Sequence, residues 1–400
     1  MRLCTRCIMD TTDPGIRFDE QGVCNHCREY DRFVRDRQLA PDQRDAKFKK
    51  IIQWIQDGGR GRKYDSILGI SGGVDSSYLA WRAWKNGLRT LLVHMDNSWD
   101  SELAVKNVEN LVKTTGFDYY NHVVDWEEFK DLQLAYLRAS VVDVEVVTDH
   151  AIVALVYRLA RQFGIRYILT GVNRVTETVM PQRGWNYPYK NDLTNLRAIH
   201  RRFGQVTLKT YPTLSLAQIK CYQCLRGFEH VDLLDYLAYD ATVARAILER
   251  EFNWRYYGGK HWESVFTKFY QAYILPKKFN VDKRKAHLSN LICSGQITRA
   301  QALERMQQDI YSPALMKEDY EFVVKKLGLT AAEFEEIMAR PPVPHEAYPT
   351  EINQLSYQVQ SLLYEAIHRT GRFTRNAIRS PLRRLRDQYR TRMSVAPRRA

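Results

Sequence analysis

A short apolar strand that runs into a glycine loop and then a helix constrains this chain more than any other feature. Residues 64–77 read Tyr-Asp-Ser-Ile-Leu-Gly-Ile-Ser-Gly-Gly-Val-Asp-Ser-Ser. Two consecutive glycines allow a positive φ and let backbone N–H groups approach an anion closely. Ser76 and Ser77 then stand at the positive end of the following helix. The stretch therefore predicts a phosphate-binding turn between a strand and a helix.

The glycine loop has no lysine before its serines, which separates it from the Walker type of phosphate loop. Its sequence, Ser-Gly-Gly-Val-Asp-Ser-Ser, resembles the PP-loop of ATP pyrophosphatases, which cleave ATP between the α and β phosphates and pass AMP to an oxygen of a second substrate. The alternative, a turn that only needs glycine, leaves Asp75 unexplained, whereas a carboxylate suits a place where Mg²⁺ bridges it to phosphate. Ser71 and Asp75 are the expected catalytic residues. The loop residues expected to bind ATP are Gly69, Ser71, Gly72, Gly73, Val74, Asp75, Ser76 and Ser77.

Strands and helices alternate from residue 64 onward. Apolar runs predict further strands at 90–95, 118–124 and 166–170, and helical patterns fill the intervals, with Asp125 as a helix N-cap. This order predicts an α/β fold, with a doubly wound parallel sheet of the PP-loop (adenine nucleotide alpha hydrolase-like) type.

Polar residues follow the predicted strands, at the edge of the sheet where ligands gather in such folds. His94 and Asp96 end the second strand, and Gly171 and Asn173 follow a later one. In PP-loop enzymes the position of His94 and Asp96 borders the nucleoside, and the turn with Gly171 and Asn173 lies beside the phosphates and metal. The resemblance therefore adds these four residues to the expected ATP site. A turn role for Gly171 and a cap role for Asp96 are the alternatives.

Other residues near the strands carry weaker patterns. Asp149 and His150 open the longest apolar helix, and we interpret them as a cap rather than as catalytic residues. Residues 181–215 lose periodicity and are rich in Trp, Tyr and Pro, which favours substrate contact or packing over the site. Lys209, in the same segment, is expected to bring a cation back to the phosphates as a third catalytic residue.

Two C-x₂-C pairs near the amino terminus predict a zinc ribbon. Sixteen residues separate the pairs, a spacing typical of a closed, structural site with four thiolates. So short a segment could hardly bury a core without metal, so zinc binding is expected to be coupled to its folding. Reduced cysteines in a small core are the alternative. The expected zinc ligands are Cys4, Cys7, Cys24 and Cys27.

The remaining cysteines, Cys221, Cys224 and Cys293, leave three interpretations open. They are buried thiols, or Cys221 and Cys224 hold a second metal with a histidine or carboxylate, or the three hold an iron–sulfur cluster as in some PP-loop tRNA thiolases. A lone C-x₂-C pair does not decide among them.

The net charge of +14 is concentrated at one end of the chain. From residue 366 onward there are eleven arginines and one acid, which leaves +4 for residues 1–365. A large nucleic-acid-binding face is therefore not expected; the tail suits an acidic partner, anionic lipid or RNA, or is simply solvated. No signal peptide or membrane span is apparent, so a cytoplasmic location is expected.

Residues 258–290 carry many cations, hydroxyls and aromatics. A solvated helical face is one interpretation, and a pocket for an anionic substrate is the other. The candidate substrate-binding residues are Glu177, Lys260, His261, Arg284 and His287, with Lys268 beside them. The expected organisation is a zinc ribbon at 1–35, a connecting helix at 36–62, the PP-loop domain at 63–215, a helical substrate or partner domain at 216–340, and a linker with the basic tail at 341–400.

Together these motifs resemble the N-acetyl sugar amidotransferase family of surface-polysaccharide biosynthesis. The resemblance rests on the paired cysteines, the glycine loop, residues 170–177, Cys-Tyr-Gln-Cys at 221–224 and the run 261–295, and it does not include the tail. It implies a synthetase that turns an acetamido group of a nucleotide-linked sugar into an acetamidino group, with ATP, Mg²⁺ and Zn²⁺. The resemblance also implies that a separate glutaminase partner supplies ammonia, and Arg2 fits this, since enzymes with their own amino-terminal glutaminase need cysteine there.

The chemistry implied is adenylation of the amide oxygen, followed by displacement of AMP by ammonia. A tRNA-sulfurating PP-loop enzyme with an iron–sulfur cluster is the first alternative, supported by the tail and the second cysteine pair. A zinc-ribbon nucleic-acid adaptor without catalysis is the second.

Overall fold

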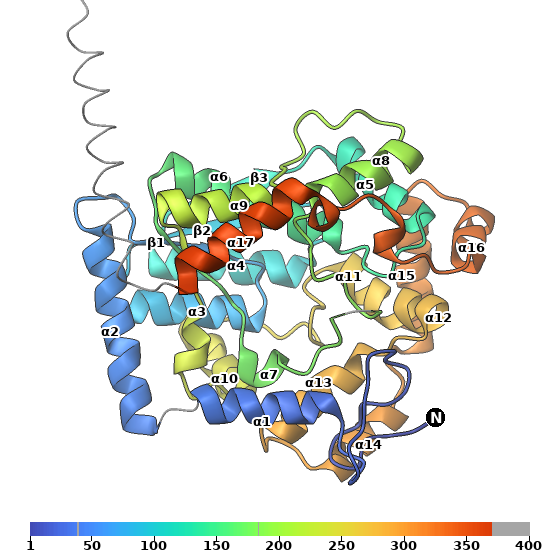
Figure 1. Ribbon diagram of the computed structural model, residues 1–400, viewed down its shortest axis with the longest axis horizontal. Helices are drawn as coiled ribbons and strands as arrows, with labels where there is room; N and C mark the ends of the chain where they lie inside the picture. The colour runs from blue at the N-terminus through green and yellow to red at the C-terminus, as the bar shows by residue number, and fades with distance from the viewer. Residues whose placement is uncertain (38–39, 183, 370–400) are drawn as a thin grey trace, which may run out of the picture.

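The computed structural model describes residues 1–37, 40–182 and 184–369, and a central parallel sheet organises them (Figure 1). The strand order is β3-β2-β1-β4-β5, with every neighbouring pair parallel. Leu68 of β1 pairs with Leu92 of β2 and with Leu169 of β4. The strands are β1 (Ser66–Gly69), β2 (Thr90–Asp96), β3 (Tyr119–Val123), β4 (Tyr167–Leu169) and β5 (Glu229–Val231).

Both faces of the sheet are covered by helices, because the central strands are apolar on both sides. Ile67 packs into one hydrophobic core and its neighbour Leu68 into another, as alternation along a strand requires. Helices α5 (Trp126–Arg138) and α6 (Val146–Gln162) contribute to the first core. Helices α3 (Val74–Lys85) and α4 (Glu102–Thr115) contribute to the second. The predicted doubly wound α/β fold is confirmed.

The helical part of the chain surrounds this sheet. The remaining α-helices are α1 (Asn25–Arg37), α2 (Pro41–Gly59), α7 (Arg174–Glu177), α8 (Leu193–Phe203), α9 (Leu216–Cys221), α10 (Ala241–Phe252), α11 (Val265–Phe269), α12 (Leu275–Phe279), α13 (Lys283–Cys293), α14 (Arg299–Gln307), α15 (Pro313–Lys326), α16 (Ala331–Ala339) and α17 (Leu355–Arg369). None of the helices that the structure describes is long and apolar enough to cross a membrane.

The glycine loop lies where the strand order reverses. From β1 the chain adds β2 and β3 on one side and then returns to place β4 on the other side. The carboxyl ends of β1, β2 and β4 are therefore neighbours, and such a switch point is where ligands bind in open α/β sheets. The three polar strand ends predicted from the sequence meet at this edge.

Three elements differ from the sequence-based expectation. The short strand β5 and the helix α8 lie in segments without clear periodicity. Helix α6 begins at Val146 with Glu145 as its N-cap, so Asp149 is not the cap. Asp149 instead binds Lys190, at 2.5 Å between Oδ2 and Nζ.

Residues 341–369 pack against the body, although 341–400 was expected to be a linker and tail. The His345 ring stacks on Tyr187 with 4.2 Å between centroids, and the Val343 N–H donates to the Ser140 carbonyl at 2.9 Å. Helix α17 lies along α9, as Figure 1 shows in red and yellow-green. The arginine-rich residues beyond 369 lie outside the described part of the chain.

Candidate active site

The glycine loop is held in one conformation by its surroundings. Gly72 has a φ of 78°, and a Cβ at this position would lie 2.5 Å from the Ala104 carbonyl oxygen. The Trp254 indole N–H donates to the Gly72 carbonyl at 3.1 Å. The Gly73 N–H donates to the Ser71 hydroxyl at 3.2 Å, and Gly73 is the N-cap of α3. Only glycine therefore fits position 72, and the loop presents the start of α3 to a ligand.

Asp75 stands in the first turn of α3 among other charged groups. The Tyr239 hydroxyl donates to its Oδ1. Burial, the strongest influence, raises the pKa of the Asp75 carboxyl; Lys260 opposes this and Glu177 adds to it, so the pKa stays above its ordinary value. A bound divalent cation would stabilise the neighbouring carboxylates of Asp75 and Glu177. The residues present thus fit a Mg²⁺ site.

Lys260 and Glu177 form an ion pair beside Asp75, with 2.8 Å between Nζ and Oε1. Their side chains are 34% and 30% exposed. Burial would lower the pKa of Lys260, but the charges of Glu177 and Asp75 outweigh it and hold the pKa above its ordinary value. Burial would likewise raise the pKa of Glu177, and Lys260 reverses this. The pair is surrounded by protein yet reachable from solvent, as a ligand-binding pair must be.

The other predicted strand-end residues also lie at this edge. A Cβ on Gly171 would lie 3.6 Å from the Ser76 nitrogen, so the turn after β4 touches the start of α3. The Asn173 N–H donates to Glu177 at 3.4 Å. His94 lies between the Ile70 carbonyl, at 2.8 Å from Nδ1, and Asp100, at 3.2 Å from Nε2. Their contact with ATP stays a prediction.

Asp96 and the segment after β2 form a tight turn. The Asp96 carboxylate accepts the Ser98 N–H at 2.8 Å, and Ser98 has a positive φ of 65°. The next residues are tied to a distant segment: the Ser101 N–H donates to the Glu263 carbonyl and the Val265 N–H to the Trp99 carbonyl, each at 2.8 Å. Residues 257–265 are thereby placed over the glycine loop.

This distant segment supplies residues that sequence reasoning missed. A Cβ on Gly73 would lie 3.2 Å from Glu263 Oε1 and 3.4 Å from the Tyr257 hydroxyl. Glu263 Oε2 is buried and has no hydrogen-bond partner among the described residues. We call Asp75, Glu177, Lys260 and Glu263 the glycine-loop cluster. Lys260 pairs with Glu177, and the charges of Asp75 and Glu263 also act on it, so three carboxylates surround one lysine and favour an added cation.

His261 and His287 lie together next to this cluster. Their ring centroids are 5.9 Å apart, and His261 Nδ1 is 3.8 Å from Glu263 Oε1. Burial lowers the pKa of His287 well below its ordinary value, and the nearby charges of Lys260, His261 and Lys283 act in the same direction. Among the five candidate substrate-binding residues, Glu177, Lys260, His261 and His287 are thus brought together.

Two predicted site residues lie elsewhere. Arg284 binds Asp282, the N-cap of its own helix, at 2.8 Å and also donates to the Gln308 carbonyl at 2.7 Å, so its charge is already paired. Lys209 is exposed, and its backbone N–H donates to Glu128 of α5 at 2.9 Å. No polar contact among the described residues joins either side chain to the glycine loop. The structure does not bring these two residues to the glycine loop, and their roles stay predictions.

The four amino-terminal cysteines form one buried group. Their Sγ atoms all lie within 4.8 Å of one another, with 4.0 Å between Cys4 and Cys27 and 3.6 Å between Cys7 and Cys24. Tetrahedral zinc with Zn–S bonds of about 2.3 Å needs S···S separations of about 3.8 Å. Backbone N–H groups of Cys7 and Cys24 point at the Cys4 sulfur, at 3.4 and 3.2 Å. The group fits a closed structural zinc site.

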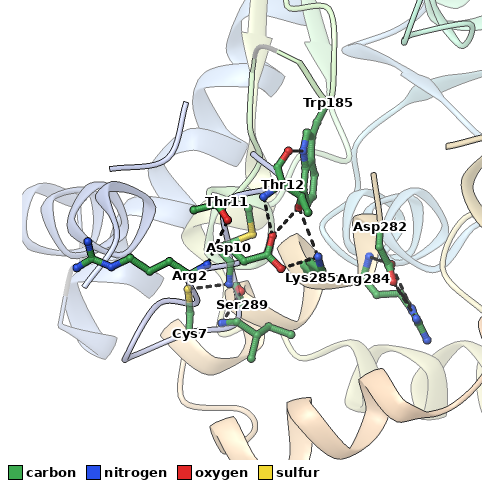
Figure 2. Close-up of polar contacts among 12 residues, drawn as sticks. Arg2, Cys7, Asp10, Thr11, Thr12, Trp185, Asp282, Arg284, Lys285 and Ser289 are labelled. Carbon is green, nitrogen blue, oxygen red and sulfur yellow. Dashed lines mark hydrogen bonds and ion pairs between the residues drawn. The ribbon is translucent and has the colours of Figure 1, made fainter. Parts of the chain in front are cut away.

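The zinc ribbon is fastened to the helix that carries His287. Lys285 of α13 binds Asp10 at 2.6 Å, the Ile8 N–H donates to the Ser289 hydroxyl at 3.2 Å, and Arg299 donates to the Cys4 and Cys7 carbonyls, both at 3.1 Å. We call these bonds the ribbon contact. Figure 2 shows Asp10, Thr12, Lys285 and Ser289 converging, with the Asp282–Arg284 pair apart from them.

The second cysteine pair does not form a metal site with Cys293. Cys221 is exposed, and Cys293 lies 3.8 Å from Cys27, Sγ to Sγ, beside the ribbon. Among the described residues, the amino-terminal tetrad is the only group of three or more His, Cys, Asp or Glu residues whose ligand atoms all lie within 4.8 Å of one another. The structure therefore does not bring the three cysteines together, and a second metal site at Cys221 and Cys224 stays a prediction.

One protein-family model matches part of this chain. Residues 263–362 match the model of the C-terminal domain of WbpG-like LPS biosynthesis proteins. The match spans α11 to α17 and crosses the boundary predicted at residue 340. It confirms the resemblance to a surface-polysaccharide family. No curated protein matches the sequence significantly.

Solved structures similar to this chain are only distantly related to it. An NMN synthetase from Francisella tularensis has a TM-score of 0.32 and 13% identity, covering 73% of this chain and 98% of that one. An NH3-dependent NAD synthetase from Campylobacter jejuni has a TM-score of 0.28 and 13% identity, and the match covers 54% of this chain and 85% of that one. A predicted tRNA methyltransferase subunit from Methanocaldococcus jannaschii has a TM-score of 0.27 and 14% identity, and the match covers 46% of this chain and 74% of that one.

Proposed function

From the premise that its C-terminal part belongs to the WbpG-like family of LPS biosynthesis proteins, we propose that this chain is an ATP-dependent, AMP-forming amidotransferase. Its substrate is a nucleotide-linked sugar with an acetamido group, which it converts to an acetamidino group. Ammonia is supplied by a separate glutaminase subunit, and AMP and pyrophosphate are released. The reaction serves surface-polysaccharide biosynthesis in the cytoplasm.

The observation that carries the proposal is the glycine-loop cluster. The loop offers backbone N–H groups and a helix start to phosphate, while the carboxylates of Asp75 and Glu177 stand beside it. No lysine lies in the loop, and the nearest cation, Lys260, comes from a distant segment that also brings His261 and Glu263. This combination suits ATP with a metal on one side and a second substrate on the other.

The chemistry follows from the stability of amides. An amide carbonyl resists ammonia because its oxygen is a poor leaving group. Transfer of AMP to that oxygen forms a bond from oxygen to the α phosphorus and breaks the α–β bridge, so pyrophosphate departs. Ammonia then attacks the carbon, and AMP leaves with the former amide oxygen. Positioning and charge stabilisation suffice for both steps, without a protein nucleophile.

Each residue of the cluster has a role in this scheme. The N–H groups at Gly72 and Gly73 and the start of α3 hold the departing pyrophosphate. Asp75 and Glu177 are the residues that would hold Mg²⁺, which when bound offsets the phosphate charge. Lys260 stabilises the charge developing on phosphate. His261 and His287 face the sugar substrate.

The test is an assay of the purified zinc-loaded protein with ATP, Mg²⁺, ammonium and acetamido sugar nucleotides. The proposal expects AMP and pyrophosphate in equal amounts, formed only when an acetamido sugar is present. Formation of ADP, or no nucleotide turnover with any acetamido sugar nucleotide, would contradict it. A tRNA substrate and an iron analysis, run in parallel, test the sulfurating alternative.

A further inference from the structure

A second group of buried charges lies outside the glycine-loop cluster. It consists of Asp143, Glu145 and Asp149 around the start of α6, with Lys190 and Lys283, and we call it the acid-rich cluster. Lys190 Nζ lies 3.3 Å from Asp143 and 2.5 Å from Asp149. The Thr267 hydroxyl of α11 donates to Glu145 Oε2 at 3.0 Å. Nothing in the proposed adenylation uses these residues.

Two carboxylate oxygens of the acid-rich cluster have no donor. Glu145 is 8% exposed and Asp143 is 0% exposed. Glu145 Oε1 and Asp143 Oδ1 are buried without a hydrogen-bond partner among the described residues. No lysine or arginine described in the structure forms an ion pair with Glu145. Buried acceptors are normally satisfied, so these two oxygens indicate a missing ligand that donates hydrogen bonds.

The acid-rich cluster lies on the glycine-loop side of the sheet. Helix α6 leads into β4 of the parallel sheet, so it starts at the carboxyl edge, and its residue Ile152 approaches Gly69 at the end of β1. Thr267 follows Glu263 by about one helical turn, and Lys283 precedes His287 by one turn of α13. Charges of both Lys260 and Lys283 act on His287. His287 is therefore influenced by a lysine of each cluster.

The charge balance selects the kind of ligand. Three acids face two lysines, and Lys190 is already shared by two of the acids. Burial lowers the pKa of Lys283, and the nearby acids offset only part of this effect. Lys283 therefore keeps its positive charge less firmly than an exposed lysine. Burial and Asp149 raise the pKa of Glu145 to about 7. A phosphate or carboxylate would be repelled here, whereas a small cation with several N–H donors would satisfy the free oxygens.

We propose that Glu145 and Asp143 bind, as ammonium, the ammonia that reaches this chain, and that the Glu145 carboxylate takes up the extra proton when ammonia leaves to attack the activated carbon. This inference rests on the proposed function for its role in catalysis, but the site itself does not depend on it. Glu145 Oε1 and Asp143 Oδ1 accept N–H bonds from the ion, and the Thr267 hydroxyl positions the Glu145 carboxylate.

The first experiment is an ammonium titration of AMP formation with the full chain, ATP, Mg²⁺ and a fixed acetamido sugar nucleotide. Sodium chloride keeps the ionic strength constant. Glu145→Gln retains the shape of the side chain, and we expect it to raise the KM for ammonium at least ten-fold while the KM for ATP changes less than two-fold. Thr267→Val should raise the ammonium KM by a smaller factor. An unchanged ammonium KM, or a parallel rise for ATP, would overturn the proposal.

The second experiment measures binding without turnover, so that it also decides the matter if the proposed reaction fails. The melting temperature is compared in ammonium, potassium and sodium chloride at equal ionic strength, because a ligand of the folded state stabilises it. We expect an ammonium-specific rise that Glu145→Gln abolishes and the exposed control Glu318→Gln retains. No such rise, or an equal rise with potassium, would refute an ammonium site.

Discussion

The glycine-loop cluster and the ribbon contact are both built from charged residues far apart in the sequence, but their charges are balanced differently. In the ribbon contact Asp10 accepts from Lys285 and from Thr12, and the Arg299 guanidinium donates to two carbonyls. In the glycine-loop cluster Lys260 pairs with Glu177 while the charges of Asp75 and Glu263 lie nearby, and Glu263 Oε2 has no partner among the described residues. The first contact is complete in the protein alone, and the second is not.

This difference separates structural residues from candidate functional ones. A satisfied, nearly buried ion pair fixes one element against another, and removing one partner leaves a buried charge unpaired. A cluster with surplus negative charge, in which the pKa of Asp75 is raised, is costly to the free protein and becomes favourable when a cation and substrate bind. The two regions should therefore respond in opposite ways to mutation: loss of stability in one and loss of activity in the other.

The largest effect on activity is expected for Asp75→Asn. Because burial raises the pKa of this carboxyl, its charge destabilises the folded protein near neutral pH, so removing the charge should leave the melting temperature equal or higher. The rate of AMP formation should fall by about a hundred-fold or more. Asp42→Asn, an exposed acid in the first turn of α2, is the matched control and should change neither quantity. A destabilised Asp75→Asn protein would place this residue with the structural ones.

Cys24→Ser should have the next largest effect, because loss of zinc should prevent the ribbon from folding. We expect zinc content to fall from one ion per chain to well below one, because a closed tetrahedral site loses a thiolate. Zinc binding and ribbon folding are coupled, so the ribbon contact and the placement of α13 are lost with it. Zinc analysis and amide hydrogen exchange on α13 check this; full zinc content with unchanged exchange would contradict it.

Lys285→Met breaks the ribbon contact without touching a zinc ligand. It leaves the buried Asp10 carboxylate without its cation, which costs about 3 kcal/mol of unfolding free energy for a buried pair. Lys317→Met, in an exposed pair on α15, should cost less than about 1 kcal/mol. Denaturant unfolding compares the two. Equal losses would show that the ribbon contact is no stronger than a surface pair.

The smallest effect is expected for the double variant Cys221→Ser, Cys224→Ser. These cysteines share the C-x₂-C spacing of the ribbon but lie apart from Cys293 and the tetrad. Zinc content and AMP formation should stay within two-fold of the unsubstituted protein. Loss of a bound metal in this variant would establish the second metal site that the sequence leaves open.

Local patterns predicted the elements whose contacts are close in sequence. The glycine loop, four of the strands and the cysteine tetrad each carry a short motif, and the N-caps at Ser101 and Asp125 satisfy backbone N–H groups within three residues. Strand β5 was missed because it is three residues long and contains Glu229 and His230, which do not resemble an apolar strand.

Residues of the candidate site that depend on distant contacts were not predicted. Tyr239, Tyr257 and Glu263 reach the glycine loop from more than 160 positions away, and no local pattern marks them. Arg284 was assigned to the site for its charge, but Asp282, two residues before it, pairs with that charge. Glu145 lies among valines just before the predicted start of an apolar helix at Asp149, and no local pattern marks it as part of a polar site.

The most direct test of the central claim follows the amide oxygen itself. An acetamido sugar nucleotide labelled with ¹⁸O in the acetamido carbonyl is converted by the protein with ATP, Mg²⁺ and ammonium, and the products are analysed by mass spectrometry. AMP transfer to the amide oxygen predicts one ¹⁸O atom in the phosphate of AMP and none in pyrophosphate. Label that appears in inorganic phosphate beside ADP, or that stays in the sugar product, would contradict adenylation.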